Sequence, residues 1–220
     1  MNLFMHYCFD CWMQRTHPQC PFARYADDAV VHCRSQAEAE HLLASIGERL
    51  AHCKLTMHPD KSKVVYCKDN KRRREYPQVQ FTFLGFTFKP RIAADKRGQT
   101  FTGFLPAVSR EATVRMFRTI KSWQLQRQTS STIEDLSTRY NPVLRGWWNY
   151  YGSFYPSALD RIDRQVDQKL AYWVRRKYKR LAGKLISSFA WLSRVAQRLP
   201  KLFVHWQSRS QLSYPIMGAV

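Results

Sequence analysis

The sequence predicts an α+β protein in which short strands and helices precede a purely helical region. Two observations support this fold class. Before about residue 107 the apolar side chains alternate between strand and helix periods, and after it they keep the helical period. Hydrophobic residues make up 45% of the 220-residue chain, which is enough for a packed interior.

The first elements are a helix, a hairpin and a second helix. Residues 1–16 place apolar side chains on one helical stripe. Residues 22–34 predict two short strands around the acidic turn Asp27-Asp28. Ser35, with Glu38 three positions later, forms a capping box that opens an amphipathic helix ending near Cys53.

A small set of strands is expected next. Residues 63–67 and 80–89 each predict a strand, with Gly85 at a bend in the second one, and residues 101–105 return as its hairpin partner. A basic block at positions 71–74 lies in the polar connection between these strands, where solvation and nucleic-acid contact are equally good interpretations.

Capping residues and prolines place the helices of the second half. Ser109 caps one helix, and Ser131 with Glu134 forms another capping box. Asn141-Pro142 is expected to restart a helix, since proline is best tolerated at the first helical position. Further helices are predicted at residues 157–181 and 185–206, the second of them interrupted by Pro200.

The charge balance favours a polyanionic partner. Lys and Arg total 36 against 16 Asp and Glu, which gives a net charge of +20. Such an excess is a cost to folding through self-repulsion, and a nucleic acid compensates for it by releasing counterions on binding. No stretch reaches the roughly 20 apolar residues that span a bilayer, so a membrane partner is not expected.

The six cysteines show no disulfide framework, and we therefore expect a reducing intracellular compartment, the cytoplasm of a bacterium. Cys8 and Cys11, with His17 and Cys20, allow a compact zinc site. The favoured alternative places Cys8 and Cys11 on the apolar face of the first helix.

Two adjacent carboxylates at the tip of a hairpin repel each other unless a cation lies there. Magnesium is the natural partner, because it takes hard oxygen ligands and keeps open positions for phosphate oxygens. On the dipeptide Asp27-Asp28 alone, an ordinary turn is the better interpretation.

The surrounding residues change this balance. The segment Tyr25-Ala26-Asp27-Asp28 resembles the catalytic hairpin of reverse transcriptases, in the form found in group II intron proteins. Residues 55–63 and Phe83-Leu84-Gly85-Phe86 are similar to the motifs that follow it, the second of these being the primer grip. Residues 109–183 resemble the maturase-specific region that serves as the thumb, with its core at 144–151.

This resemblance implies a reverse transcriptase and maturase that uses a two-metal Mg²⁺ site. It assigns Tyr25, Asp27, Asp28 and Lys61 to the catalytic set, with Asp27 and Asp28 as metal ligands and Lys61 helping to protonate pyrophosphate. The implied partners are group II intron RNA and a DNA primer or target. The implied domains are the end of the palm at residues 1–107, the thumb at 108–184 and a basic tail at 185–220.

The thumb and the basic block supply the expected RNA contacts. These residues are Arg72, Arg73, Arg74, Arg145, Trp148, Arg175, Arg176, Lys179 and Arg180. The four cations from Arg175 onward lie near the end of a helix, where the helix dipole also favours them. For Trp147, Trp148 and Tyr151, core packing is the more common role at helical spacing, and we expect Trp148 at the edge of the core or in contact with RNA.

One departure from the family leaves alternatives open. The third metal-binding aspartate and the fingers of these polymerases belong to motifs ahead of residue 1, and Asp10 is no replacement for that aspartate. We therefore expect an N-terminally truncated polymerase that does not extend a primer unaided, and an upstream fragment is a possible partner. The alternatives are an RNA-binding maturase without polymerase activity, or an inactive remnant.

Overall fold

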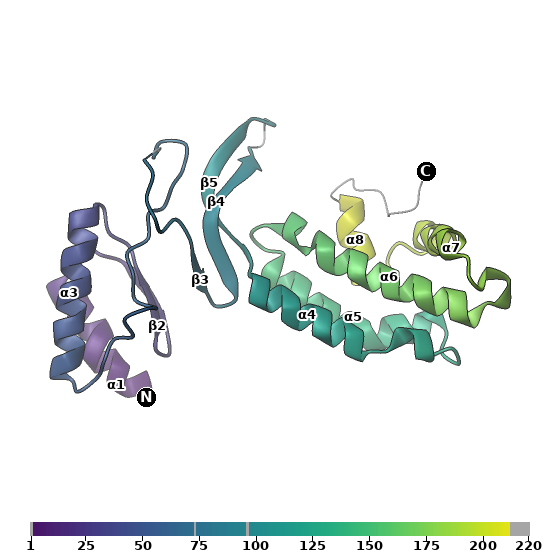
Figure 1. The fold of residues 1–220 in the computed structure, drawn as a ribbon, viewed down its shortest axis with the longest axis horizontal. Coiled ribbons are helices and arrows are strands. Elements are labelled where there is room, and N and C mark those ends of the chain that lie inside the picture. The colour runs from purple at the N-terminus through teal and green to yellow at the C-terminus, as the bar shows by residue number, and fades with distance from the viewer. Residues whose placement is uncertain (1, 73, 96, 212–220) are drawn as a thin grey trace. The chain divides into compact units, whose positions relative to one another are not determined.

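The computed structural model describes residues 2–72, 74–95 and 97–211, and it divides into two compact units between Leu105 and Pro106 (Figure 1). It contains both helices and small antiparallel sheets, so the predicted α+β class is confirmed. None of its described helices is long and apolar enough to cross a membrane.

The N-terminal unit begins with a helix that widens in its middle. Between α1 (Asn2–Met5) and α2 (Cys11–Thr16), the segment η1 (His6–Asp10) is a π-helical turn, in which the N–H of Cys11 bonds to the carbonyl of His6. Arg49 donates from Nε to the Cys8 carbonyl at 3.0 Å. Single π-helical turns within α-helices are frequent at functional sites.

The predicted hairpin and the helix after it are confirmed. Strands β1 (Phe22–Tyr25) and β2 (Asp28–Val31) pair antiparallel, with Phe22 opposite Val31 and Tyr25 opposite Asp28. Helix α3 (Gln36–His52) follows, and the Ser35 hydroxyl accepts from the N–H of Glu38, which is the first bond of the predicted capping box. The Glu38 carboxylate accepts from the N–H of Arg34 at 2.6 Å. A small apolar core joins these elements, formed by Met5, Phe9, Met13, Cys20 and Leu42.

The strand predicted at residues 63–67 is not formed. These residues lie in an irregular connection, where Tyr66 makes a backbone bond to the carbonyl of Gln78 and its ring lies 4.2 Å from that of Tyr76. The side chains of residues 64–67 are half-buried, but among the described residues no neighbouring strand pairs with this segment to form a sheet.

A three-stranded sheet ends this part of the chain, in the order β3 (Phe81–Phe83), β4 (Phe86–Ala94), β5 (Thr100–Val108). The pairing expected between residues 80–89 and 101–105 is confirmed, but 80–89 is two strands and not one. Leu84 and Gly85 both have positive φ, 50° and 79°, and form a two-residue turn between β3 and β4.

The C-terminal unit is helical. It contains α4 (Arg110–Ser122), α5 (Ile133–Tyr151), α6 (Asp160–Lys177), α7 (Leu185–Arg198) and α8 (Val204–Gln211), with short 3₁₀ turns η2 (Leu125–Arg127), η3 (Pro156–Leu159) and η4 (Lys179–Leu181). Its core includes Ile120, Leu136, Leu144, Leu170, Trp173 and Leu192. The predicted cap at Ser109 is confirmed, since its hydroxyl accepts from the N–H of Ala112.

Two helix boundaries differ from the prediction. The capping box of α5 uses Thr132 and Asp135 and not Ser131 and Glu134. Pro142 does not restart a helix but lies inside α5. The interior proline costs about 3 kcal/mol, and burial of Leu136, Tyr140 and Leu144 on one stripe offsets it at about 1.5–3 kcal/mol for each large apolar side chain.

Buried polar contacts fix the last helix. The Asp167 carboxylate accepts from the indole N–H of Trp206 at 3.0 Å and lies 2.8 Å from Nε2 of His205. Asn141 donates to the carbonyl of Leu202 and accepts from the N–H of Val204. Helix α8 therefore docks on α5 and α6 in one orientation, because each of these bonds is directional.

Candidate functional site

The acidic turn between β1 and β2 presents its carboxylates to solvent. Ala26 and Asp27 form a two-residue loop, and Asp28 closes it opposite Tyr25. Asp27 and Asp28 are exposed, and Tyr25 is 65% exposed. Ala26 has a φ of 55°, a backbone conformation that residues other than glycine rarely adopt. The loop is therefore strained and needs an external contact to hold it.

Arg24 supplies that contact. Its guanidinium donates from Nε and Nη2 to the two oxygens of Asp10, at 2.7 and 2.6 Å, and from Nη1 to the carbonyl of Ala26 at 2.6 Å. The Arg24 and Asp10 side chains are only 10% and 16% exposed. Because the bidentate geometry fixes the planar fork, Arg24 ties the π-helical turn to the tip of the hairpin.

The same contact sets the protonation of Asp10. The hydrogen bonds from Arg24 hold the pKa of this carboxyl below its ordinary value of 3.8, against the opposing effect of burial, and His6 adds a smaller effect in the same direction. Asp10 is thus ionised and already paired. Among the described residues it cannot serve as a third metal ligand without giving up Arg24.

The carboxylates of Asp27 and Asp28 remain available. Within the described ranges neither forms an ion pair with a Lys, Arg or His side chain. Two exposed, adjacent oxygen donors fit a hard divalent cation such as Mg²⁺. In the same ranges no third acidic, histidine or cysteine side chain joins them in a group that could hold an ion, so the pair is a partial ligand set.

The other residues predicted for the polymerase site lie on two further segments. Lys61 is exposed in a turn closed by the backbone bond from Ser62 to His58. Phe83, Leu84, Gly85 and Phe86 form the β3–β4 turn. Leu84 is exposed and Phe86 is buried, so only the tip of this turn offers a contact surface.

The basic block is anchored at its first residues. The Asp69 carboxylate accepts from the N–H groups of Lys71 and Arg72, while Asn70 exchanges bonds with the backbone of Thr102 in β5. Arg72 and Arg74 are exposed, and Arg73 lies outside the described residues.

The helical unit holds most of the excess charge. Residues 106–220 contain 20 of the 36 Lys and Arg residues but only 6 of the 16 Asp and Glu residues. Two of those six, Asp163 and Asp167, are buried. The surface of this unit is therefore more positive than its composition already indicates, as a polyanion-binding surface requires.

The predicted contact residues of this unit fall into two groups. Arg145, Arg176, Lys179 and Arg180 are exposed. Arg175 is half-buried with its guanidinium 5.2 Å from the centre of the Tyr172 ring. Trp148 is half-buried and donates its indole N–H to Asp163 at 3.2 Å. The indole of Trp148 therefore lies at the edge of the core, where it packs against core side chains and bonds to Asp163.

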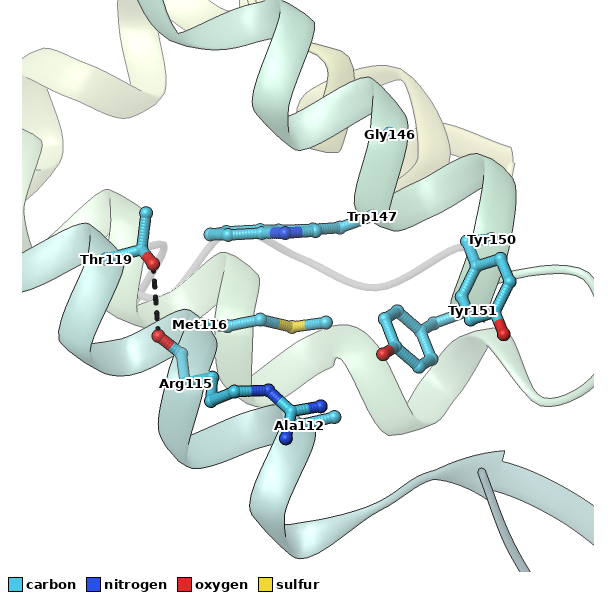
Figure 2. Close-up of a pocket in the computed structure, with 8 residues that line it drawn as sticks. All are labelled: Ala112, Arg115, Met116, Thr119, Gly146, Trp147, Tyr150 and Tyr151. Carbon is cyan, nitrogen blue, oxygen red and sulfur yellow. Dashed lines mark hydrogen bonds between the residues drawn. The ribbon is translucent and has the colours of Figure 1, made fainter. Parts of the chain in front are cut away.

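A cavity of about 280 Å³ lies between α4 and α5, and sequence reasoning did not find it (Figure 2). Trp147, Tyr150 and Tyr151 line it from α5, and Met116 and Thr119 line it from α4. Arg115 is exposed at the same site, and Gly146 leaves open space beside it, since a Cβ there would meet nothing within 4 Å. The available signal was the run of four aromatic residues in Gly146-Trp147-Trp148-Asn149-Tyr150-Tyr151.

The zinc site considered for Cys8, Cys11, His17 and Cys20 is not assembled. Burial, with a smaller effect of the neighbouring Cys53, raises the pKa of Cys8 to about 11. The sulfur of Cys11 lies 3.5 Å from Nε2 of His6. Of the four residues, only Cys20 belongs to a group within the described ranges that could hold a metal.

Comparison with known families agrees with this arrangement. Residues 1–88 match the reverse transcriptase (RNA-dependent DNA polymerase) family, and residues 113–191 match the group II intron, maturase-specific domain. No curated protein matches the chain. The chain thus combines, in this order, a reverse transcriptase segment and a maturase-specific domain, the combination found in group II intron reverse transcriptases and maturases.

The Asp10–Arg24 pair predicts a pH-dependent stability of the hairpin. The pKa of Asp10 is lower in the folded state, so its contribution is fully present above the unfolded pKa near 4 and is lost as pH falls through the folded pKa. We expect Asp10→Asn to destabilise β1 and β2 by about 1–2 kcal/mol near neutral pH.

Hydrogen exchange of the β1 and β2 amides measures this effect. The difference between Asp10→Asn and the unsubstituted protein should shrink toward pH 3, and Asp60→Asn, a change at an exposed carboxyl, should have no effect. A difference of constant size down to pH 3 would show that ionisation of Asp10 is unimportant.

Proposed function

We propose that this chain binds group II intron RNA through its helical unit, assists the splicing of that RNA, and contributes Asp27 and Asp28 to a polymerase metal site used in retrohoming. The observation that carries the proposal is the segregation of charge, with 20 basic and 6 acidic residues in positions 106–220. The match to the maturase-specific domain makes intron RNA the best candidate for the polyanion.

The α4–α5 cavity favours RNA as the partner over a polyanion that has no bases. Single-stranded or looped RNA is recognised by stacking of splayed bases on aromatic rings, with cations on the adjoining phosphates. Trp147, Tyr150 and Tyr151 offer ring surface, and Arg115 supplies a cation at the same site (Figure 2). Arg145, next to Gly146, is exposed and adds a second cation on α5.

The hairpin supports the polymerase part of the proposal. Arg24 holds the loop through the Ala26 carbonyl and is occupied by Asp10, so it does not neutralise the two carboxylates at the tip. When bound to such a pair, Mg²⁺ ions activate a primer hydroxyl and steady the leaving pyrophosphate. The role of the chain itself is to present two oxygen ligands in a fixed turn.

A second candidate is an RNA-binding maturase that performs no polymerisation. It is favoured by one observation, which is that no third carboxylate accompanies Asp27 and Asp28 within the described ranges. Both candidates share the RNA-binding surface and differ in the use of the acidic turn.

We predict that affinity for structured intron RNA falls steeply with salt and depends on the α4–α5 surface. Gly146→Phe adds a ring at the cavity, at a position where a Cβ meets nothing within 4 Å, and should weaken binding about tenfold, as expected for the loss of one stacked base. Arg115→Ala should lower the slope of log affinity against log salt by about one.

A fluorescence anisotropy titration of labelled intron RNA measures both effects. Gln197→Phe places the same ring on an exposed position of α7 and serves as the matched control. The double change Asp27→Ala/Asp28→Ala should leave affinity unchanged. Equal affinity of the Gly146→Phe and Gln197→Phe variants would refute the α4–α5 surface as the RNA site.

We further predict that the purified chain binds RNA but does not extend a DNA primer in Mg²⁺, because two carboxylates are an incomplete ligand set. An upstream polypeptide that carries the third aspartate should restore extension, and Asp28→Asn should abolish the restored activity. Primer extension by the chain alone, lost in Asp28→Asn, would contradict the incomplete ligand set. Absence of extension with the added polypeptide would favour the non-polymerising maturase.

A further inference from the structure

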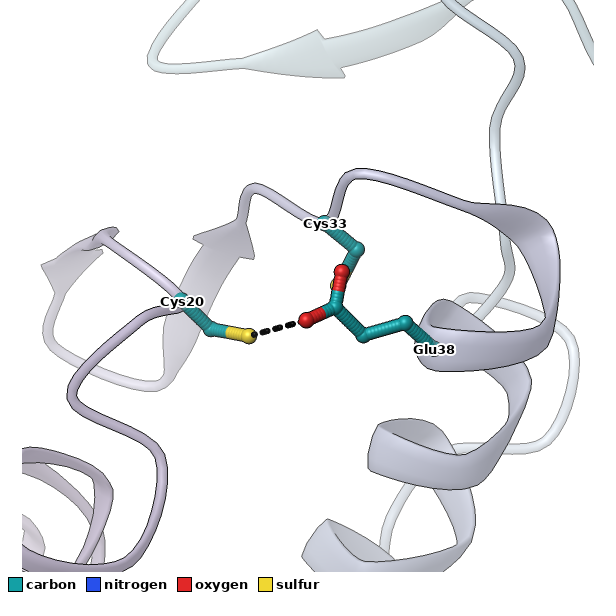
Figure 3. A group of neighbouring side chains, drawn as sticks. All are labelled: Cys20, Cys33 and Glu38. Atoms are coloured by element: carbon teal, nitrogen blue, oxygen red, sulfur yellow. Dashed lines mark hydrogen bonds between the residues drawn. The ribbon is translucent and has the colours of Figure 1, made fainter.

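Cys20, Cys33 and Glu38 meet at the base of the β1–β2 hairpin (Figure 3). Extending the strand register by two residues beyond Phe22 and Val31 places Cys20 opposite Cys33, and the backbone bond from His32 to Pro21 lies between them. Glu38 reaches the same place from the first turn of α3. Three chain segments thus direct soft and hard ligand atoms to one point.

The distances fit a small tetrahedral ion. The two sulfurs and a Glu38 oxygen all lie within 4.8 Å of one another, and Cys20 Sγ is 3.5 Å from Glu38 Oε1. Around Zn²⁺, with bonds of about 2.3 Å to sulfur and about 2.1 Å to oxygen, ligand atoms lie roughly 3.5–3.8 Å apart. The ligand atoms therefore need to move by no more than about 1 Å.

Glu38 is oriented in advance. Its Oε2 accepts from the backbone N–H of Arg34 at 2.6 Å, which turns Oε1 toward the two thiols. Outer hydrogen bonds of this kind orient the ligands of metal sites and raise their affinity. Cys20 is buried, and Cys33 and Glu38 are half-buried, so the site lies at the edge of the small apolar core.

The thiols are protonated in the absence of a metal. Burial raises the pKa of both, that of Cys33 to about 11, and Cys20 donates its S–H to Glu38. Arg34 contributes a positive charge near Cys20 and Glu38. Such a charge partly balances the excess negative charge of two thiolates and a carboxylate around a divalent ion.

We propose that Cys20, Cys33 and Glu38 form a binding site for a borderline-soft divalent cation, with Zn²⁺ the best match. Binding of Zn²⁺ forms two Zn–S bonds and one Zn–O bond and releases the two thiol protons to solvent, while a water completes the tetrahedron. The ion ties both hairpin strands to α3 behind the Asp27-Asp28 turn. This site is distinct from the proposed Mg²⁺ site, whose ligands Asp27 and Asp28 are oxygen donors only.

Cd²⁺ and Zn²⁺ test the site directly. Titration of the reduced full-length chain with Cd²⁺ should give one thiolate-to-metal charge-transfer band that saturates at one ion per chain. Zn²⁺ should displace the Cd²⁺ and raise the melting temperature of the hairpin region. Cys20→Ser and Cys33→Ser should each weaken Zn²⁺ binding by more than about tenfold, whereas Cys67→Ser, at a half-exposed cysteine of the irregular connection, should not.

The variant Glu38→Gln distinguishes loss of a metal ligand from loss of the fold. Glutamine keeps an oxygen that can accept from the N–H of Arg34 and removes the charge, so this variant should fold normally and bind Zn²⁺ more weakly. Equal Zn²⁺ affinity of the Cys20→Ser, Cys33→Ser and unsubstituted proteins would overturn the proposal. Formation of a Cys20–Cys33 disulfide under the reducing conditions, with no metal bound, would also overturn it.

Discussion

The bidentate contact between Arg24 and Asp10 is the interaction on which the N-terminal unit depends. Asp10 ends the π-helical turn, Arg24 lies on β1, and the third guanidinium nitrogen holds the Ala26 carbonyl in the strained loop. One side chain thus fixes the helix, the strand and the turn together. It also occupies the guanidinium of Arg24, and within the described ranges Asp27 and Asp28 form no ion pair with a basic side chain.

In the helical unit, burial takes carboxylates away from the surface, whereas the N-terminal unit exposes them at the acidic turn. Asp163 and Asp167 accept indole N–H groups from Trp148 and Trp206, which removes two of its few acidic groups from the surface. The cations remain outside, because long Arg and Lys side chains extend their charged ends into water. The core and the proposed RNA-binding surface are therefore two consequences of one distribution of charged side chains.

Local signals predicted much of this structure. The hairpin, the caps at Ser35 and Ser109 and the acidic turn follow from spacing within a few residues. Errors arose where distant contacts decide the outcome, as with Pro142, which stays helical because its neighbours are buried on one stripe. The Arg24–Asp10 pair, the Cys20–Cys33–Glu38 cluster and the α4–α5 cavity join residues from different elements, and no local pattern predicts such contacts.

We propose that Arg24, held by Asp10, leaves the acidic turn free for a divalent cation. Manganese binding measured by electron paramagnetic resonance tests this claim in three proteins, the unsubstituted chain, Asp10→Asn and Asp10→Asn/Arg24→Gln. We expect weaker Mn²⁺ binding in Asp10→Asn, because the released guanidinium then competes for Asp27 and Asp28, and recovery of binding in the double variant. Unchanged or tighter binding in Asp10→Asn would contradict it.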